Sequence, residues 1–277
     1  MHIKQRQFQS EKWMEMKESF VRALAILADG EPVSGFSRAR LMGSERMDSS
    51  AGLFPYLFTL HLWNLSDDGY LALSRCRSVT VKSEDAELVS GQFADSSRVI
   101  SFQGSVATIC FSPGLPLWQA QVSVSVDAGA TVRETAAQLL AASGTGKELL
   151  TAEGMDAVFS RPQAYHGRAA ECIEEALAMA GARACIVPSG LSVVPASGVP
   201  VSLALDEEDL LDAPEFPHTG LMLVRTRAAG WTLGKSARVS WEGKEYTGLI
   251  RERSFDLDTG DGPWSTELIL ELGRNEQ

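Results

Sequence analysis

Hydrophobic and polar residues alternate in many short segments of this chain, and the alternation predicts β-strands. In FTLHLW (58–63), the side chains of Phe58, Leu60 and Leu62 fall on one face of an extended backbone, and the residues between them fall on the other. Clusters of turn-forming residues at 66–69 and 112–114 separate this segment from the next ones. Further strands are predicted in SVTVKS (78–83), SRVISFQGSVATICFS (97–112) and WQAQVSVSV (118–126).

The first part of the chain carries two overlapping patterns. Apolar residues recur at helical spacing from Trp13 to Leu27, whereas FVRALAILADGEPVSGFSRARL (20–41) reads as two extended runs around Asp29–Gly30, a pair common in hairpin turns. We favour a short helical or irregular arm, residues 1–18, followed by a β-hairpin.

The pattern changes near residue 127, where helical spacing begins. Thr131 and Glu134 form a capping-box sequence ahead of an apolar stripe, which predicts a helix. A second helix is predicted from about 167 to 180, and Gly181 follows where a helix-ending glycine is expected. Two short strands, ACIV (184–187) and LSVV (191–194), follow around the turn at 188–190.

The remainder is again β-like, with a tight turn predicted at 241–244. Its strands are predicted in VPVSLAL (199–205), TGLMLVRT (219–226), SARVSWEG (236–243), EYTGLIRERSF (245–255) and WSTELILEL (264–272). Strands grouped apart from helices argue against a doubly wound parallel sheet. The expected fold is α+β and mainly β, with an arm (1–18), a first β-domain (19–122), a small α/β domain (123–195) and a second β-domain (196–277).

Composition narrows the functional classes. The chain has 277 residues, of which 44% are hydrophobic and 22% charged, enough for ordinary globular cores. Its net charge of −11 repels phosphate backbones, which disfavours sequence-specific nucleic-acid binding. We expect neither a signal peptide nor a membrane span. The cysteines form no CxxC pair and suit free, buried thiols: Cys76, Cys110, Cys172 and Cys185.

A phosphate-loop motif is approached but not reached in SGTGKELL (143–150). Ala141 stands where that motif has its first glycine, and Glu148 stands where it has a magnesium-binding Ser or Thr. A flexible connection after a helix is the better interpretation, and no cofactor is predicted.

The acidic segment DLDTGDGPWSTELILEL (256–272) raises the question of a metal site. Asp256, Asp258 and Glu267 occupy relative positions 1, 3 and 12 of a calcium loop, but Asp261 replaces the glycine of position 6 and the flanks read as strands. A β-hairpin turn at 258–262 is favoured, with Trp264 packed at the start of the last strand, and calcium binding by the three carboxylates stays open.

No residue set predicts catalysis. The sequence has no GxSxG, and its four histidines have no spacing typical of metal ligands or a proton relay. A carbohydrate or peptidoglycan hydrolase would have to use the aspartates at 206–212 and 256–261, whereas an acidic run such as LDEEDLLDAPE (205–215) is more often a solvated loop. The tryptophans could be core residues or anchors in subunit contacts: Trp13, Trp63, Trp118, Trp231, Trp241 and Trp264.

Three stretches together carry a family resemblance. They are GFSRARL (35–41) with FTLHLWNLSDDGYLAL (58–73), the helix and two strands of GRAAECIEEALAMAGARACIVPSGLSVVP (167–195), and the C-terminal series from DLLDAPEF (209–216) to the GD…W-T turn before the last strand. In this order they are similar to the baseplate hub proteins of bacteriophage tails, relatives of the hub part of contractile injection spikes.

The resemblance implies two tail-tube-like β-barrel or sandwich domains with a small α/β domain between them. It implies a structural protein of the virion tail, assembled in the bacterial host cytoplasm, of which three copies form a pseudo-sixfold ring. That homotrimer would join the tail tube to the central spike, contact other baseplate proteins and let DNA pass, with no enzymatic activity. Another tube-like tail component, such as a distal tail or tube-initiator protein, is the alternative.

Overall fold

The computed structural model describes residues 22–47, 53–84, 86–150, 154–187, 190–195, 199–227 and 230–273. The predicted arm, residues 1–18, lies outside these ranges. The described chain is mainly β, with most of its described helices in its middle part, so the expected α+β fold class is confirmed. The predicted hairpin around Asp29–Gly30 is also present, because Leu27 pairs with Pro32 and Ala28 with Glu31 across that turn.

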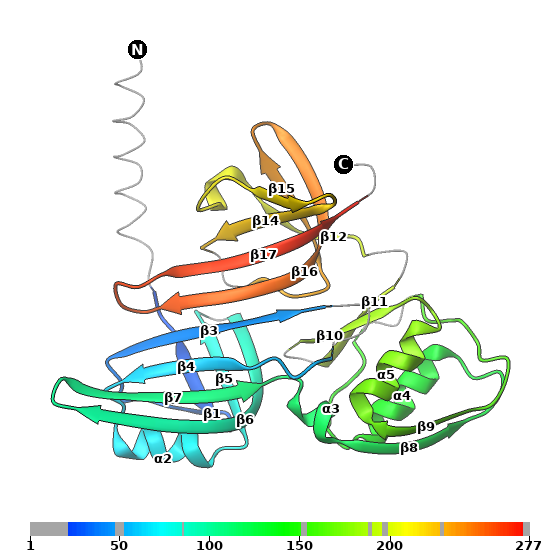
Figure 1. The fold of residues 1–277 in the computed structure, drawn as a ribbon, viewed down its shortest axis with the longest axis horizontal. Helices are drawn as coiled ribbons and strands as arrows, with labels where there is room; N and C mark the ends of the chain where they lie inside the picture. The colour runs from blue at the N-terminus through cyan, green and yellow to red at the C-terminus, as the bar shows by residue number, and fades with distance from the viewer. Residues whose placement is uncertain are drawn as a thin grey trace.

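One sheet runs through both β-regions, and Figure 1 shows β14, β17, β16, β3, β4 and β7 side by side in that order. Along its main path the order is β13-β14-β17-β16-β3-β4-β7-β6-β5-β1-β2, while β15 pairs with β16 and β12. The strands of this sheet are β1 (Ala25–Ala28), β2 (Glu31–Pro32), β3 (Arg38–Arg46), β4 (Phe58–Trp63), β5 (Ser78–Ser83), β6 (Ala86–Ser101), β7 (Gly104–Ser112), β12 (Val201–Leu205), β13 (Glu215–His218), β14 (Leu221–Thr226), β15 (Ser236–Trp241), β16 (Lys244–Asp258) and β17 (Trp264–Leu272).

The middle of the chain forms a separate helical part beside the first β-region (Figure 1). The predicted capping box is confirmed, since the Thr131 hydroxyl accepts the N–H of Glu134 and the Glu134 carboxylate accepts that of Thr131. Gly181 has φ +62° just after the second predicted helix. The elements are α3 (Leu115–Gln119), β8 (Gln121–Val126), α4 (Val132–Ala142), β9 (Gln163–Arg168), α5 (Ala169–Ala178), β10 (Arg183–Val187) and β11 (Gly190–Val194), with β8–β9 and β10–β11 both antiparallel.

Three local predictions were wrong. The cluster at 66–69 begins helix α2 (Asp67–Arg75), because the Ser66 hydroxyl caps it by accepting the N–H of Gly69. The segment 97–112 is not one strand but the β6–β7 hairpin, which turns at 102–103. Residues 115–119, including Trp118, form α3 because the proline near its start favours a first helical turn.

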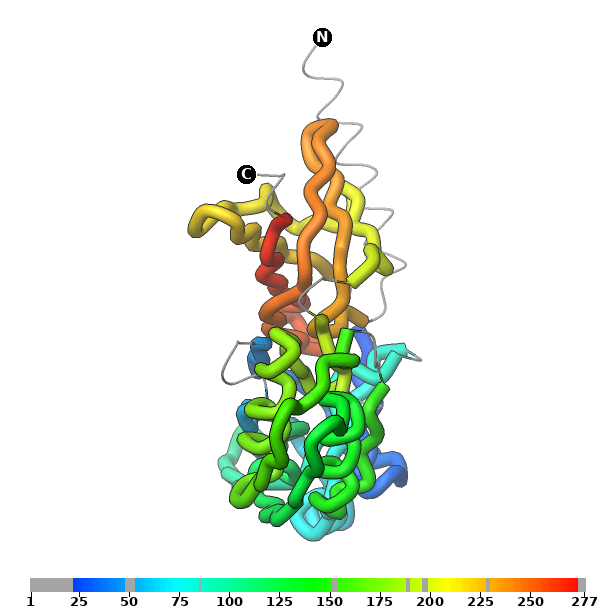
Figure 2. Tube along the Cα trace, turned by 90° about the vertical axis from the view of Figure 1, so that its right-hand side faces the viewer, coloured from blue at the N-terminus to red at the C-terminus, as the bar shows by residue number. Residues whose placement is uncertain are grey.

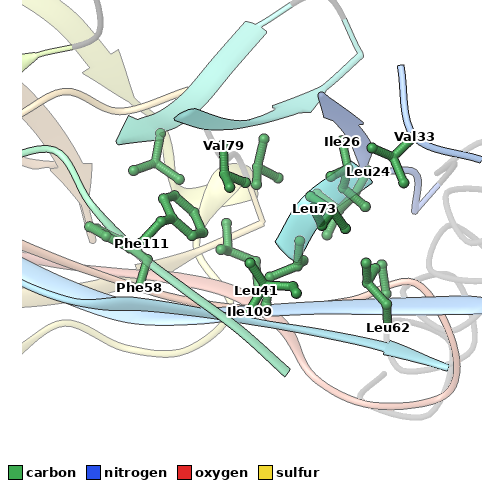
Figure 3. Packing of buried hydrophobic residues seen from close by; sticks show 14 of the residues in the cluster. Leu24, Ile26, Val33, Leu41, Phe58, Leu62, Leu73, Val79, Ile109 and Phe111 are labelled. Atoms are coloured by element: carbon green, nitrogen blue, oxygen red, sulfur yellow. The ribbon is translucent and has the colours of Figure 1, made fainter. Parts of the chain in front are cut away.

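Three hydrophobic clusters form the interior. The first-region cluster lies under β3, β4 and β7, where Phe58, Leu60 and Leu62 are buried as their alternation predicted, and Figure 3 shows part of it. Phe255, Leu257 and Trp264 from the C-terminal hairpin also pack in this cluster. The other two clusters lie in the helical part and in the second β-region, which is the upper part of the molecule in Figure 2. Within the described ranges, the helices are too short or too polar to span a membrane.

Candidate functional site

The edge-to-edge contact between β3 and β16 joins the two β-regions. The strands pair antiparallel from Arg46 opposite Glu252 to Arg40 opposite Asp258. In the sequence, the nearest ends of these strands are Arg46 and Lys244, which are more than 190 residues apart. We call this contact the seam, and it makes one sheet out of strands that the sequence analysis placed in two domains.

The acidic hairpin lies at one end of the seam, where arginines neutralise its carboxylates. Asp258 is fully buried, and its carboxylate accepts two bonds from the Arg38 guanidinium (2.7 Å for Nε to Oδ1) and one from the N–H of Gly260 at 2.9 Å. Arg38 holds the pKa of Asp258 below its ordinary value. Asp256 is bound by both donors of the Arg40 fork at 2.8 Å. The hairpin turn is confirmed, with Asp258 N–H donating to the Pro263 carbonyl at 2.9 Å.

Glu267, the third calcium candidate, belongs to a different ion pair. Its carboxylate accepts a bond from Arg225 Nε at 2.9 Å, and Arg225 also contacts Asp212 at 3.1 Å and Glu215 at 3.3 Å. The three candidate carboxylates therefore meet three different arginines instead of converging on one ion. Among the residues with described positions, no group of three or more His, Cys, Asp or Glu side chains could hold a metal.

A buried ion pair crosses the seam near the end opposite the acidic hairpin. Arg253 of β16 bonds to Glu45 of β3, and their side chains are only 4% and 6% exposed. The same guanidinium donates to the carbonyl of Trp231 and, at 3.0 Å, to that of Leu88 in β6. Arg253 thus connects strands of both β-regions with the loop before β15. Nothing in the local sequence pattern distinguishes Arg253 from its half-buried charged neighbours, so this group could not be predicted from the sequence.

The sheet face opposite the first-region core is polar and half-buried. On it, Arg38 stacks over the Trp63 ring, with 4.7 Å from its guanidinium carbon to the ring centroid, and His61 Nδ1 lies 3.0 Å from the Thr108 hydroxyl oxygen. Burial, and secondarily the charge of Arg40, lowers the pKa of His61. This face is therefore covered by ion pairs and hydrogen-bonded polar side chains instead of apolar side chains.

The tip of the β6–β7 hairpin is apolar and exposed. Val99 is 68%, Ile100 74% and Phe102 97% exposed, and Figure 1 shows the hairpin extending from the edge of the first β-region. Exposed hydrophobic residues gathered in one place are typical of contact surfaces. Sequence analysis missed the tip because it predicted a single strand there.

The remaining sequence candidates are the tryptophans, the cysteines and the segment 143–150. The tryptophans divide into buried (Trp231, Trp264), half-buried (Trp63, Trp118, Trp241) and, for Trp13, not described. All four cysteines are free thiols; Cys110 is half-buried and the others are buried. The segment 143–150 follows the end of α4 at Ala142 as the predicted connection.

The fold is similar to that of several solved structures, although no known protein-family model and no curated protein sequence matches this chain. The tail protein from Neisseria meningitidis MC58 has a TM-score of 0.68 and 14% identity, over 93% of this chain and 98% of that chain. The 43 kDa tail protein of prophage MuSo2 from Shewanella oneidensis has a TM-score of 0.60 and 12% identity, over 90% of this chain and 96% of that chain.

A third structure connects this fold to secretion machines. The E. coli c3393 protein, described as a component of the type VI secretion system with structural similarity to the T4 bacteriophage tail proteins gp27 and gp5, has a TM-score of 0.64 and 10% identity. The match covers 91% of this chain and 77% of that chain. The resemblance inferred from the sequence is therefore confirmed at the level of the fold: this chain has the fold of phage tail proteins.

Proposed function

We propose that this chain is a structural protein of a phage tail, a baseplate hub of which three copies close a ring around a channel. In this proposal the regions 19–122 and 196–277 are the two tube-like domains of each copy, and the ring joins the tail tube to the central spike. The tail-protein fold supports the structural role, and the described contacts support the ring as set out below.

The observation that carries the proposal is the continuous sheet with two different ends. At the seam the second β-region presents β16 to β3, so each copy already contains one edge-to-edge contact between β-regions. Its outer edges are β13–β14 at one end and, on the other side, β2 together with the free edge of β6, the part beyond Phe93 that pairs only with β7 among the described strands. Different ends make a contact between copies head-to-tail, and head-to-tail contacts close into rings when the rotation allows. With two regions per copy, three copies would place six around the ring.

The polar face of the sheet suits a channel wall. Its arginines are bound to Asp256 and Asp258, so a passing phosphate backbone meets ion pairs instead of free cations, and the chain as a whole is acidic. The exposed apolar tip at Val99, Ile100 and Phe102 supports a further contact with another tail component.

Two alternatives make different predictions. A distal tail or tube-initiator protein would share the tube-like fold, but the helical part with its own core favours the hub. A hydrolase of this kind needs two carboxyls in a cleft, one of them a general acid with a raised pKa. The pKa of Asp258 is lowered instead, and Asp256 is held by Arg40, so these residues do not support hydrolysis.

The test is the solution mass of the purified chain, by light scattering over a dilution series, followed by electron microscopy of the largest species. We expect a species near three times 29.9 kDa with a central channel. A chain that stays monomeric at every concentration, or an assembly without threefold symmetry, would contradict the hub.

A further inference from the structure

The register of the sheet sets its β13–β14 edge and the start of the free β6 edge at matching levels. At the second-region end, Leu210 forms a bridge with Thr226 of β14. From Thr226, one row of cross-strand partners can be followed through the seam to Phe93 of β6, where the free edge of that strand begins. The row is Thr226, Thr266, Phe255, Gly43, Phe58, Phe111 and Phe93. A head-to-tail contact between copies therefore brings the surroundings of Leu210 close to the level of Phe93.

The surroundings of Phe93 are hollow. A pocket of about 610 Å³ opens where β5, β6, α3 and the connection after α4 meet. Phe93, Pro113 and Pro116 give it apolar walls, and Arg77 and Lys147 line it with cationic groups. Lys147 belongs to the segment SGTGKELL (143–150), which approaches a phosphate-loop motif in its sequence.

Lys147 is a half-buried cation that lines the pocket. It forms no ion pair within 4.0 Å with the residues that the structure describes. Burial lowers its pKa, and the charge of Glu87 opposes this shift without cancelling it. Arg77 is exposed and lies beside Asp29, whose carboxylate accepts the backbone N–H groups of Arg77 and Ser78. Two cationic side chains line the pocket, and a carboxylate that entered it would meet both charges, so the pocket is suited to a carboxylate.

The surroundings of Leu210 supply carboxylates. The acidic turn, residues 206–209, consists of Asp206, Glu207, Glu208 and Asp209, all of them exposed. Its shape is fixed: Asp209 accepts the N–H of Asp206 at 2.9 Å, and next to it Leu211 N–H donates to the Arg225 carbonyl at 2.8 Å. The turn is therefore a preformed anionic projection at the β13–β14 end of the sheet.

We propose that the pocket at Arg77 and Lys147 in one copy of the chain receives the acidic turn 206–209 of the next copy. This rests on the proposed ring and specifies its closing contact. Opposite charges at the same level of the β13–β14 edge and the free β6 edge fix the direction of the contact, and each copy supplies one half of it. Like-charge repulsion between two pockets or two turns disfavours the reversed arrangement.

Charge reversal tests the contact in the full-length chain. We expect Lys147→Glu and Glu207→Lys each to weaken the trimer, so that the concentration below which it dissociates rises at least tenfold. The measurement is sedimentation velocity in low salt. The variant carrying both changes should recover most of this loss, because the carboxylate introduced into the pocket of one copy then faces the amine introduced into the turn of the next. Lys244→Glu, which reverses an exposed lysine in the β15–β16 turn, is the matched control and should leave the trimer unchanged.

A zero-length carbodiimide cross-link gives a second readout that does not depend on folding of the variants. The reagent couples an amine only to a carboxylate in contact with it, and mixed isotopically labelled chains separate bonds between copies from bonds within one. We expect a between-copy bond from Lys147 to the 206–209 peptide. A trimer that is indifferent to Lys147→Glu and gives no such bond would overturn this inference and leave the hub standing. A chain that is monomeric at all concentrations would overturn both.

Discussion

Replacing Arg253 by Met should destabilise the protein by roughly 4–6 kcal/mol. The change leaves the Glu45 carboxylate buried without its counter-charge, and breaking a buried ion pair from one side costs about 3–5 kcal/mol. It also removes a charged donor from the carbonyls of Trp231 and Leu88, and each carbonyl left unpaired adds about 1–3 kcal/mol. The methionine recovers part of this loss by burying apolar atoms in the same space.

The partner variants separate charge from packing. Glu45→Gln keeps an acceptor for Arg253 and should cost about 2–3 kcal/mol. The double variant Glu45→Met with Arg253→Met removes both charges, so its cost should fall below the sum of Glu45→Met and Arg253→Met by at least about 2 kcal/mol. Arg183→Met breaks a half-exposed pair with Glu271 and serves as the control, with an expected effect within about 1 kcal/mol.

The assay is urea unfolding followed by tryptophan fluorescence, with the midpoint and slope fitted separately. An effect of Arg253→Met no larger than that of Arg183→Met, or a double variant that equals the sum of its parts, would refute the idea that Arg253 ties the two β-regions together. A second unfolding transition in Arg253→Met would support it, because the regions would then unfold separately.

Four further outcomes follow from single contacts. Trp264→Ala should cost about 3–5 kcal/mol in the same assay, because the ring is only 5% exposed and packs in the first-region cluster; a loss under about 1 kcal/mol would contradict that packing. Arg38 lowers the folded-state pKa of Asp258, so this carboxylate stabilises the fold above its unfolded pKa of about 3.9, and the stabilisation is lost as pH falls through the folded pKa. The difference in unfolding free energy between wild type and Asp258→Asn should therefore shrink from pH 6 to pH 2, and a constant difference would disprove the linkage. Burial raises the pKa of Cys185 to about 12, so this thiol should escape iodoacetamide at pH 8 until urea unfolds the chain, and rapid native labelling seen by mass spectrometry would contradict its burial. Calcium should leave the melting temperatures of wild type and Asp256→Asn unchanged, whereas a calcium-dependent rise in wild type alone would restore the metal-site interpretation.

Much of the local structure could be predicted from the sequence because it depends on neighbouring residues. The alternation correctly predicted that Phe58, Leu60 and Leu62 are buried on one face of a strand. The capping box of Thr131 and Glu134 correctly predicted the start of a helix. These signals are local: the period of the backbone fixes which side chains share a face, and a capping group reaches only three residues. A local signal led to a wrong prediction where it is compatible with two kinds of structure. At 66–69, the same Ser and Asp residues are common both in turns and at the start of a helix.

Contacts between distant segments were decided only by the tertiary structure. The sequence indicated that residues 256–264 form a hairpin, but not that its Asp256 and Asp258 bind arginines of β3 or that Trp264 completes the core of the first β-region. Strand alternation determines which face is buried, and it carries no information on which edge will pair with which partner. The seam between β3 and β16, the buried Arg253 and the two charged ends of the sheet all depend on that choice of partner, which is settled by the packing of the whole chain.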